Sequence, residues 1–198
     1  LIKLTSHEIF HSYFPFYTGL NETKYAWMDE GLTCYGEYRT VYDIDSPEQA
    51  NFYFYKSYKW YIGHDWDLPI MANTDYIKSP LYDFNSYVKP GVFFKILNYE
   101  LGDAQFIKAL QGFVKRWKGK HPTPHDFFFT FMDITGKNLD WLIQPWFFEY
   151  GYMDLAIKEI RSRKNKHKIV VEKLGHYPGP FCLRVIFTDG SKKIIEDK

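Results

Sequence analysis

The stretch His7-Glu8-Ile9-Phe10-His11 places two histidines four residues apart, with a glutamate directly after the first. On a helix, residues four apart lie on the same face, so His7 and His11 can bind one metal ion together. A catalytic zinc site takes three protein ligands, including neutral imidazole nitrogens, and leaves a fourth position for water. Glu8 would lie beside such a metal, where its carboxylate can accept a proton from that water. The motif therefore predicts a zinc site that still needs one ligand.

The third ligand is predicted in the string Trp27-Met28-Asp29-Glu30-Gly31. Glu30 follows His11 after 18 intervening residues. That spacing suits a helix, a loop and a second helix that returns a carboxylate to the two histidines. Taken alone, each histidine has an ordinary alternative as a packed residue, and Glu30 has one as a surface acid. A chance match of all three, however, requires the residue types and the spacings to coincide. We therefore predict one Zn²⁺ held by His7, His11 and Glu30.

The amino-acid composition limits the kinds of protein that can carry this motif. The 25 basic and 24 acidic residues leave a formal charge of +1, which predicts no electrostatic attraction to nucleic acid. Aromatic residues make up 21% of the 198 residues, and such side chains more often fill a core than line a binding groove. No apolar run approaches the ~20 residues of a transmembrane helix. Cys34 and Cys182 are expected to be buried free thiols rather than a disulfide.

Hydrophobic periodicity changes once along the chain, near residue 153. Up to that point it predicts helices, and after it Leu155 to Phe187 alternate as in strands, with Asp189-Gly190 as a hairpin turn. We therefore expect a mainly α protein, with a helical domain at residues 1–152 and a small antiparallel β-domain at 153–198. The predicted helices span 5–14, 25–42, 46–61, 90–101, 103–117, 123–136 and 138–150, with a long loop at 64–86.

The residues from His7 to Gly31 resemble the signature of the alanyl aminopeptidase and leukotriene hydrolase family of gluzincin zinc metallopeptidases. In that family the motif is followed by 18 residues, a glutamate and usually a glycine, as in Glu30-Gly31. The resemblance implies a thermolysin-like helical part of a zincin catalytic domain that leads into a β-domain. It also implies zinc-dependent hydrolysis of a peptide or protein substrate, aminopeptidase-like, with Glu8 as general base.

Two further residues gain a role from these arguments. Tyr87-Val88-Lys89-Pro90-Gly91 resembles the family's Tyr-x-Lys-Gly segment with one extra residue, which implies that Tyr87 stabilises the oxyanion. The insertion leaves Tyr82 as the second choice. Glu37 lies seven residues, about two turns, after Glu30 and so shares its helix face, where it can orient a metal-bound histidine; a solvated surface acid is the alternative.

The chain also departs from the family. It begins at Leu1 without Met, after the point where the aminopeptidases carry a Gly-x-Met-Glu-Asn segment that holds the substrate amine. We therefore expect a fragment with apolar surface exposed around the first helix and some self-association. Exopeptidase and endopeptidase activity both stay open. Two rivals remain: a zinc-binding but catalytically silent domain, and a scaffold that binds proteins through its aromatic surface. The family is often found in the cell envelope or outside the cell, but these residues assign no location.

Overall fold

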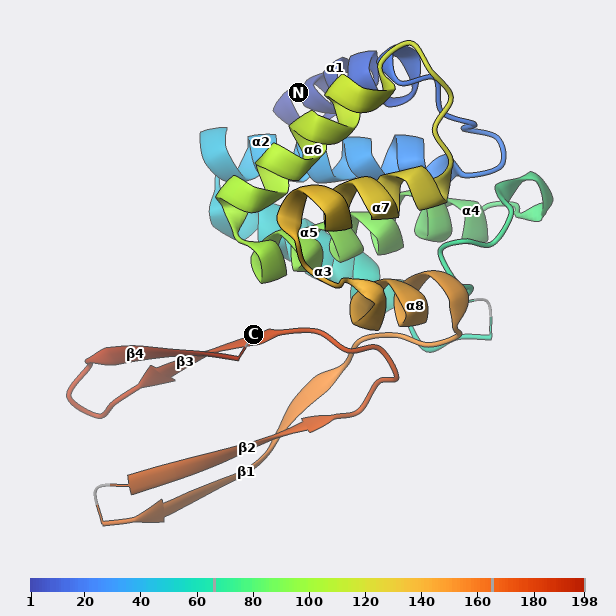
Figure 1. Ribbon diagram of the computed structural model, residues 1–198. Helices are drawn as coiled ribbons and strands as arrows, with labels where there is room; N and C mark the ends of the chain where they lie inside the picture. Colours follow the sequence, from blue (N-terminus) through green and yellow to red (C-terminus); the bar gives the residue numbers. More distant parts are fainter. Residues whose placement is uncertain (66, 165, 198) are drawn as a thin grey trace.

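The computed structural model describes residues 1–65, 67–164 and 166–197. Figure 1 shows the helices gathered in one body and the strands in two hairpins that extend from its α8 side. The α-helices are α1 (Ile2–Phe10), α2 (Leu32–Ile44), α3 (Pro47–Tyr61), α4 (Leu81–Asp83), α5 (Lys89–Leu101), α6 (Asp103–Trp117), α7 (Pro124–Thr135) and α8 (Asp140–Phe148). Short π- and 3₁₀-helical turns are η1 (Ser12–Tyr17), η2 (Trp27–Gly31), η3 (Thr74–Tyr76) and η4 (Phe84–Val88). The strands are β1 (Leu155–Arg163), β2 (Lys166–Lys173), β3 (Phe181–Ile186) and β4 (Lys192–Asp197). The predicted mainly α fold followed by antiparallel strands is confirmed.

Helix starts predicted from local sequence are found where expected. The Ser46 hydroxyl accepts a hydrogen bond from the backbone N–H of Gln49, and α3 then begins at Pro47. Thr123 and Asp126 form a reciprocal capping box at the start of α7. These contacts join residues three apart, so the sequence alone specifies them.

The first predicted helix is wrong in its second half. α1 ends at Phe10, and the chain leaves helical geometry at Phe14, where φ is −130° and ψ is 108°. The next residue is Pro15, whose ring disfavours the helical region for the residue before it. The kink leaves the carbonyl of Phe14 within hydrogen-bond distance of the His11 ring.

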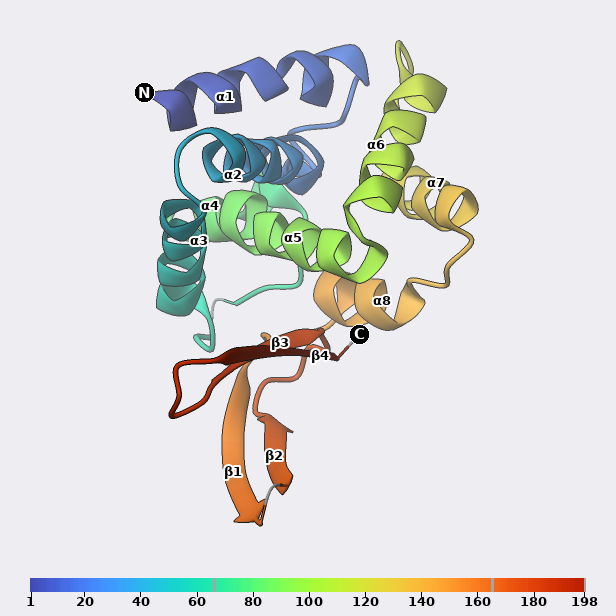
Figure 2. The same cartoon turned by 90° about the vertical axis from the view of Figure 1, so that its left-hand side faces the viewer.

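The core is built from aromatic side chains, as composition suggested. Trp27 is 1% exposed, and its ring lies 4.7 Å from that of Phe147 and 5.8 Å from that of Phe128. Figure 2 shows α2 and α5 running through the middle of the helical body, with α1 outside α2. A Cβ on Gly36 of α2 would lie 2.5 Å from the ring of Phe10. The glycine therefore lets α1 lie closely on α2 with His7 and His11 above it.

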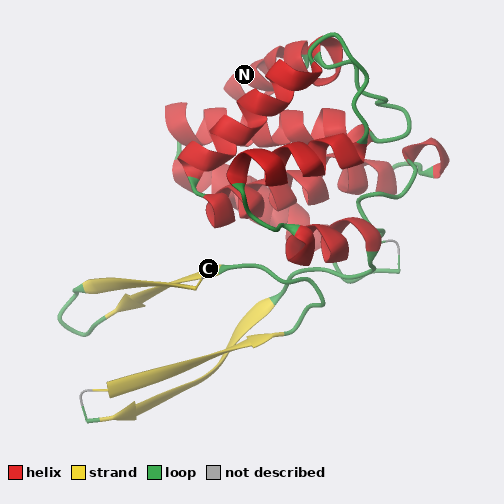
Figure 3. Cartoon of the chain, in the orientation of Figure 1, coloured by secondary structure: helices red, strands yellow, loops and turns green. Residues whose placement is uncertain are grey.

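The strands form two separate two-stranded antiparallel sheets, β1–β2 and β3–β4 (Figure 3). The linker between the hairpins is anchored to α8. Tyr177 is fully buried and donates a hydrogen bond to the carbonyl of Glu149 at 2.7 Å, while Trp146 Nε1 donates to the carbonyl of Pro178 at 3.2 Å. Because this linker packs on the helices, β2 and β3 do not pair. The boundary between domains at residues 152 and 153 stays a prediction.

A buried ion pair joins the start of α5 to the loop between α3 and η3. Lys89, at the start of α5, is fully buried, and its Nζ lies 2.5 Å from Oδ1 of Asp67. The same ammonium donates to the carbonyls of Leu68 at 2.6 Å and Gly151 at 3.3 Å. It also lies 4.9 Å from the ring centre of Tyr177. Sequence reasoning had noted Lys89 only as part of a motif.

Exposed apolar side chains gather on α1 and η1. Leu4 is 65% exposed, Ile9 59% and Phe16 78%. This surface agrees with the expectation that led us to predict self-association, which itself stays a prediction. Within the described residues, no helix is long and apolar enough to cross a membrane. Both cysteines are free thiols, but Cys182 is exposed, so its predicted burial is wrong.

Candidate metal centre

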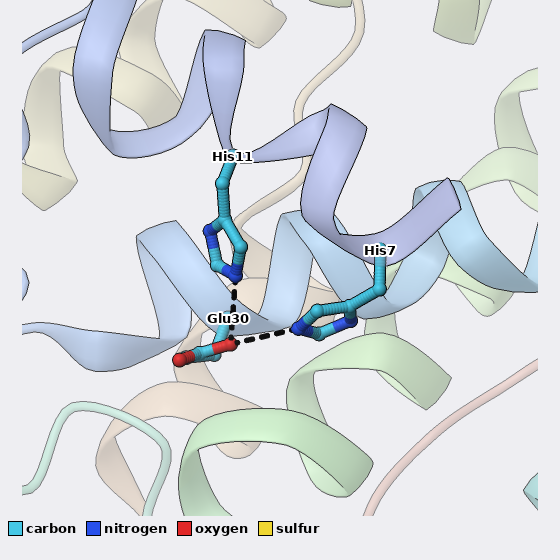
Figure 4. A group of neighbouring side chains, drawn as sticks. All are labelled: His7, His11 and Glu30. Carbon is cyan, nitrogen blue, oxygen red and sulfur yellow. Dashed lines mark ion pairs between the residues drawn. The ribbon is translucent and has the colours of Figure 1, made fainter. Parts of the chain in front are cut away.

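Three of the predicted site residues converge on one point. His7 lies on α1, His11 directly follows α1, and Glu30 lies on η2 (Figure 4). Oε2 of Glu30 lies 3.3 Å from Nε2 of His7 and 3.5 Å from Nε2 of His11. One potential ligand atom from each residue lies within 4.8 Å of the other two. The two imidazole planes are nearly perpendicular, at 82°, and both Nε2 atoms lie near the same carboxylate oxygen.

His7 is held by a second carboxylate from α2. Its Nδ1 donates a hydrogen bond to Oε2 of Glu37 at 3.1 Å, and Glu37 is only 7% exposed. Glu37 therefore contacts the histidine as predicted and is not a solvated surface acid. Its other oxygen, Oε1, lies 3.2 Å from Nζ of Lys3, a contact that sequence reasoning missed.

His11 is held by groups that the sequence did not single out. Its Nδ1 lies 2.8 Å from Oδ1 of Asp29 and 2.9 Å from the carbonyl oxygen of Phe14. Asp29 is buried. Burial, and then the charge of Glu30, raise the pKa of Asp29 to about 7 against the lowering effect of His11. Its position directly before Glu30, in the same helical turn, was the available signal.

The donor set fits a zinc ion. Each histidine uses Nδ1 for a hydrogen bond to an oxygen acceptor, which leaves Nε2 turned toward the shared point, as in metal-bound histidines with carboxylate partners. Oε2 of Glu30 is buried, and its contacts with the histidines lack hydrogen-bond geometry, so it has no hydrogen-bond partner among the described residues. A cation at this point would satisfy that oxygen. Two nitrogens and one carboxylate oxygen are the His₂Glu set of catalytic zinc sites.

The same contacts set the protonation states of His7 and Glu30 in the metal-free protein. The neighbouring carboxylates of Glu30 and then Glu37 raise the pKa of His7 to about 9. Although burial opposes the shift, contacts with His7 and Tyr87 lower the pKa of Glu30. A metal that binds His7 must therefore displace its proton, while Glu30 is already ionised.

The remaining predicted residues lie around this cluster. Glu8 follows His7 on α1, and its side chain is exposed. The Tyr87 ring stacks on His7 with ring centres 6.0 Å apart, and burial together with Glu30 raises the pKa of its hydroxyl. Tyr82 contacts Tyr87 rather than His7, with the two tyrosine ring centres 6.2 Å apart. It lines an acidic hollow together with Asp29. The structure therefore places Tyr87, rather than Tyr82, against His7.

The peptidase family M1 domain model matches residues 1–146, which hold the whole cluster. The chain belongs to peptidase family M1. Among characterised relatives, this M1 chain is 22% identical over 170 residues to the puromycin-sensitive aminopeptidase of Caenorhabditis elegans. The match covers 82% of the chain and 18% of that protein.

Solved structures share the fold of the M1 chain. Legionella pneumophila aminopeptidase A, in complex with aspartic acid, superposes with a TM-score of 0.74 at 17% identity, over 98% of this chain and 23% of that one. The M1 zinc metallopeptidase of Deinococcus radiodurans superposes with a TM-score of 0.62 at 19% identity, over 73% of this chain and 32% of that one. The M1 chain thus spans a third or less of the length of these relatives.

Proposed function

We propose that this chain carries the zinc site of a peptide-hydrolysing M1 enzyme, with His7, His11 and Glu30 as ligands. The observation that carries the proposal is the convergence of both Nε2 atoms on Oε2 of Glu30, a buried oxygen that accepts no hydrogen bond from the described residues. Membership of the M1 family supports the same chemistry. The C. elegans relative is an aminopeptidase by name, and we infer that this chain acts in the same way on peptides with a free amino terminus.

The side chains around the site then have separate tasks. When bound, zinc polarises the scissile carbonyl and lowers the pKa of a water molecule to roughly 7. Glu8 accepts the proton of the attacking water and passes it to the leaving amine. Tyr87 donates a hydrogen bond to the oxyanion of the tetrahedral intermediate. Burial and the Glu30 charge keep its hydroxyl protonated, which this task requires.

Metal content tests the ligand set directly. Glu30→Gln removes the negative charge and replaces one carboxylate oxygen by an amide NH₂ that cannot bind a metal, and we expect at least the ~100-fold loss of zinc affinity that removal of an outer partner can cause. Elemental analysis after purification should give about one zinc per wild-type chain and little in the variant. Glu172→Gln, on β2, is the matched control and should retain zinc. Equal zinc in Glu30→Gln and wild type would remove Glu30 from the ligand set.

Replacement of the two tyrosines separates their roles. Tyr87→Phe should lower kcat for peptide hydrolysis by about 10²- to 10³-fold, because one donor to the oxyanion is lost. Zinc content should not change. Tyr82→Phe is the matched control, and its kcat should stay near that of wild type. The reverse pattern would assign the oxyanion role to Tyr82.

The same measurements distinguish the catalytically silent alternative. A chain that binds one zinc but hydrolyses no peptide, in wild type and variants alike, would be a zinc-binding domain without turnover. A chain that binds no zinc, even after addition of the metal, would favour a protein-binding scaffold.

A further inference from the structure

A cavity of about 790 Å³ lies where α3 and α5 meet the strands. Tyr55 of α3 and Ile96 of α5 line two of its sides, while Leu155 of β1 and Cys182 of β3 line the third. Figure 2 shows β3 and β4 on the side of the helical body that lies away from α1, the helix of His7. Binding sites for small molecules are commonly clefts of about 300–1,000 Å³ at such junctions, with apolar walls and a few polar groups.

The walls of the cavity are mainly apolar. Phe54 of α3, Val92 of α5 and Met153 line it. The backbone N–H of Met153 donates a hydrogen bond to the hydroxyl of Tyr58 at 2.9 Å, which holds the segment that enters β1 against α3. A bound peptide would turn amide N–H and C=O groups toward these walls without partners, which is unfavourable. A hydrocarbon chain needs no such partners and is stabilised by burial.

Lys95 of α5 places an ammonium in the wall of this cavity. Its Nζ donates a hydrogen bond to Oδ1 of Asn51, which is its only hydrogen-bond acceptor within the described residues. The ammonium also lies 5.0 Å from the ring centre of Tyr38. Burial lowers the pKa of Lys95, and no carboxylate of the described residues offsets that effect. Because an ammonium has three N–H donors, two remain for a ligand.

The charged side chains that line the cavity carry one net positive charge. Among the described lining residues, Lys59 and Lys95 are the two cations and Asp154 is the one anion. A monoanion neutralises this charge, whereas a phosphate dianion would leave excess charge in apolar surroundings. The two oxygens of a carboxylate also match the two remaining donors of Lys95.

The acid that lines the cavity lies toward the opposite end from Lys95. Asp154 directly follows Met153, whose backbone N–H contacts Tyr58. Tyr58 is seven residues after Asn51, the partner of Lys95, and seven residues of helix rise about 10 Å. A carboxylate at Lys95 therefore avoids Asp154, and its chain then runs along α3 toward Tyr58.

We propose that this cavity binds an apolar monocarboxylate, with the carboxylate at Lys95 and the chain along α3. A medium-chain fatty acid has this chemistry. None of the described lining residues is one of the proposed metal ligands or one of their hydrogen-bond partners. Occupation of this site therefore goes beyond the peptidase function proposed above.

Isothermal titration calorimetry of the wild-type chain with octanoate, hexanoate and 1-octanol tests the proposal. Octanoate should bind at least about tenfold more tightly than 1-octanol, which has the same chain but no charge to pair with Lys95. It should also bind about tenfold more tightly than hexanoate, because two more CH₂ groups are buried. Bound octanoate should slow alkylation of Cys182, which lines the cavity and is otherwise exposed.

Lys95→Met removes the ammonium and keeps an apolar side chain at the same place. It should abolish the preference for octanoate over 1-octanol, and zinc content and kcat for peptide hydrolysis should not change. Lys108→Met, exposed on α6 and outside the lining, is the matched control and should keep the preference.

A second pair of variants tests the cavity if Lys95→Met lowers Tm. Cys182→Trp fills the cavity from β3 and should weaken the binding of both octanoate and 1-octanol. Arg184→Trp, two residues along the same strand and outside the lining, should leave both affinities unchanged. Equal effects of the two substitutions would overturn the placement of the chain in this cavity.

A carboxylate can also bind zinc, so the location of the bound octanoate needs its own control. Glu30→Gln should lose the metal and keep its affinity for octanoate. Loss of octanoate binding in this variant would place the ligand at the metal and overturn the proposal.

Three further outcomes would also overturn it. They are equal binding of octanoate and 1-octanol, an undiminished preference in Lys95→Met, and no binding of either compound. Tighter binding of the tripeptide Leu-Leu-Leu than of octanoate, with protection of Cys182, would assign the cavity to a peptide carboxyl terminus instead. Each of these results leaves the peptidase proposal standing, because that proposal is tested by zinc content and kcat.

Discussion

Glu8→Gln is expected to keep about one zinc per chain and to lower kcat for peptide hydrolysis by about 10²- to 10⁴-fold, the usual contribution of a positioned general base. The amide has nearly the shape of the carboxylate but cannot accept a proton from water. Glu8 is exposed beside His7, and it belongs neither to the convergent ligand atoms nor to their hydrogen-bond partners. Its loss should therefore affect the reaction and leave metal binding unchanged.

The measurement is kcat with a tripeptide substrate, alongside zinc analysis of the same preparation. Glu48→Gln, an exposed acid in the first turn of α3, is the matched control and should behave as wild type. Full activity of Glu8→Gln would exclude Glu8 as the general base. Loss of zinc from the same variant would instead give Glu8 a part in metal binding.

Lys89→Met should lower the free energy of unfolding by about 3–5 kcal/mol, the range for removal of one partner from a buried ion pair. The substitution leaves Asp67, which is 4% exposed, without its cation and removes the donor to two backbone carbonyls. It also removes the ammonium that lies over the ring of Tyr177. The linker between the two hairpins should loosen together with the start of α5.

Urea unfolding of wild type and variant measures this difference. Lys158→Met breaks an exposed pair with Glu172 on β1 and β2, and it should change stability by only about 0–1 kcal/mol. The double variant Lys89→Met with Asp67→Leu replaces both charges by apolar groups and should recover much of the loss. A stability of Lys89→Met equal to that of wild type would show that the pair contributes nothing to the folded state.

The sequence by itself determined the features that depend on neighbours in the chain. His7 and His11 lie on one helix face because they are four residues apart, and α3 and α7 begin at caps whose partners are three residues apart. The change from helical to alternating periodicity near residue 153 gave the order of helices and strands. The motif spacing from His7 to Gly31 was specific enough to indicate the family.

Only the tertiary structure decided which groups hold the histidines and which charges are buried. Glu37 meets the His7 imidazole, and Lys3 pairs with Glu37, because Gly36 lets α1 lie closely on α2. Asp29 meets the His11 imidazole from a separate helical turn. An approach between such elements leaves no local period in the sequence. Likewise, Lys89 is buried because Asp67 and the backbone carbonyls that surround it come from segments distant in the chain. Helix periods and caps follow from contacts within one turn, whereas these contacts follow from how whole elements pack.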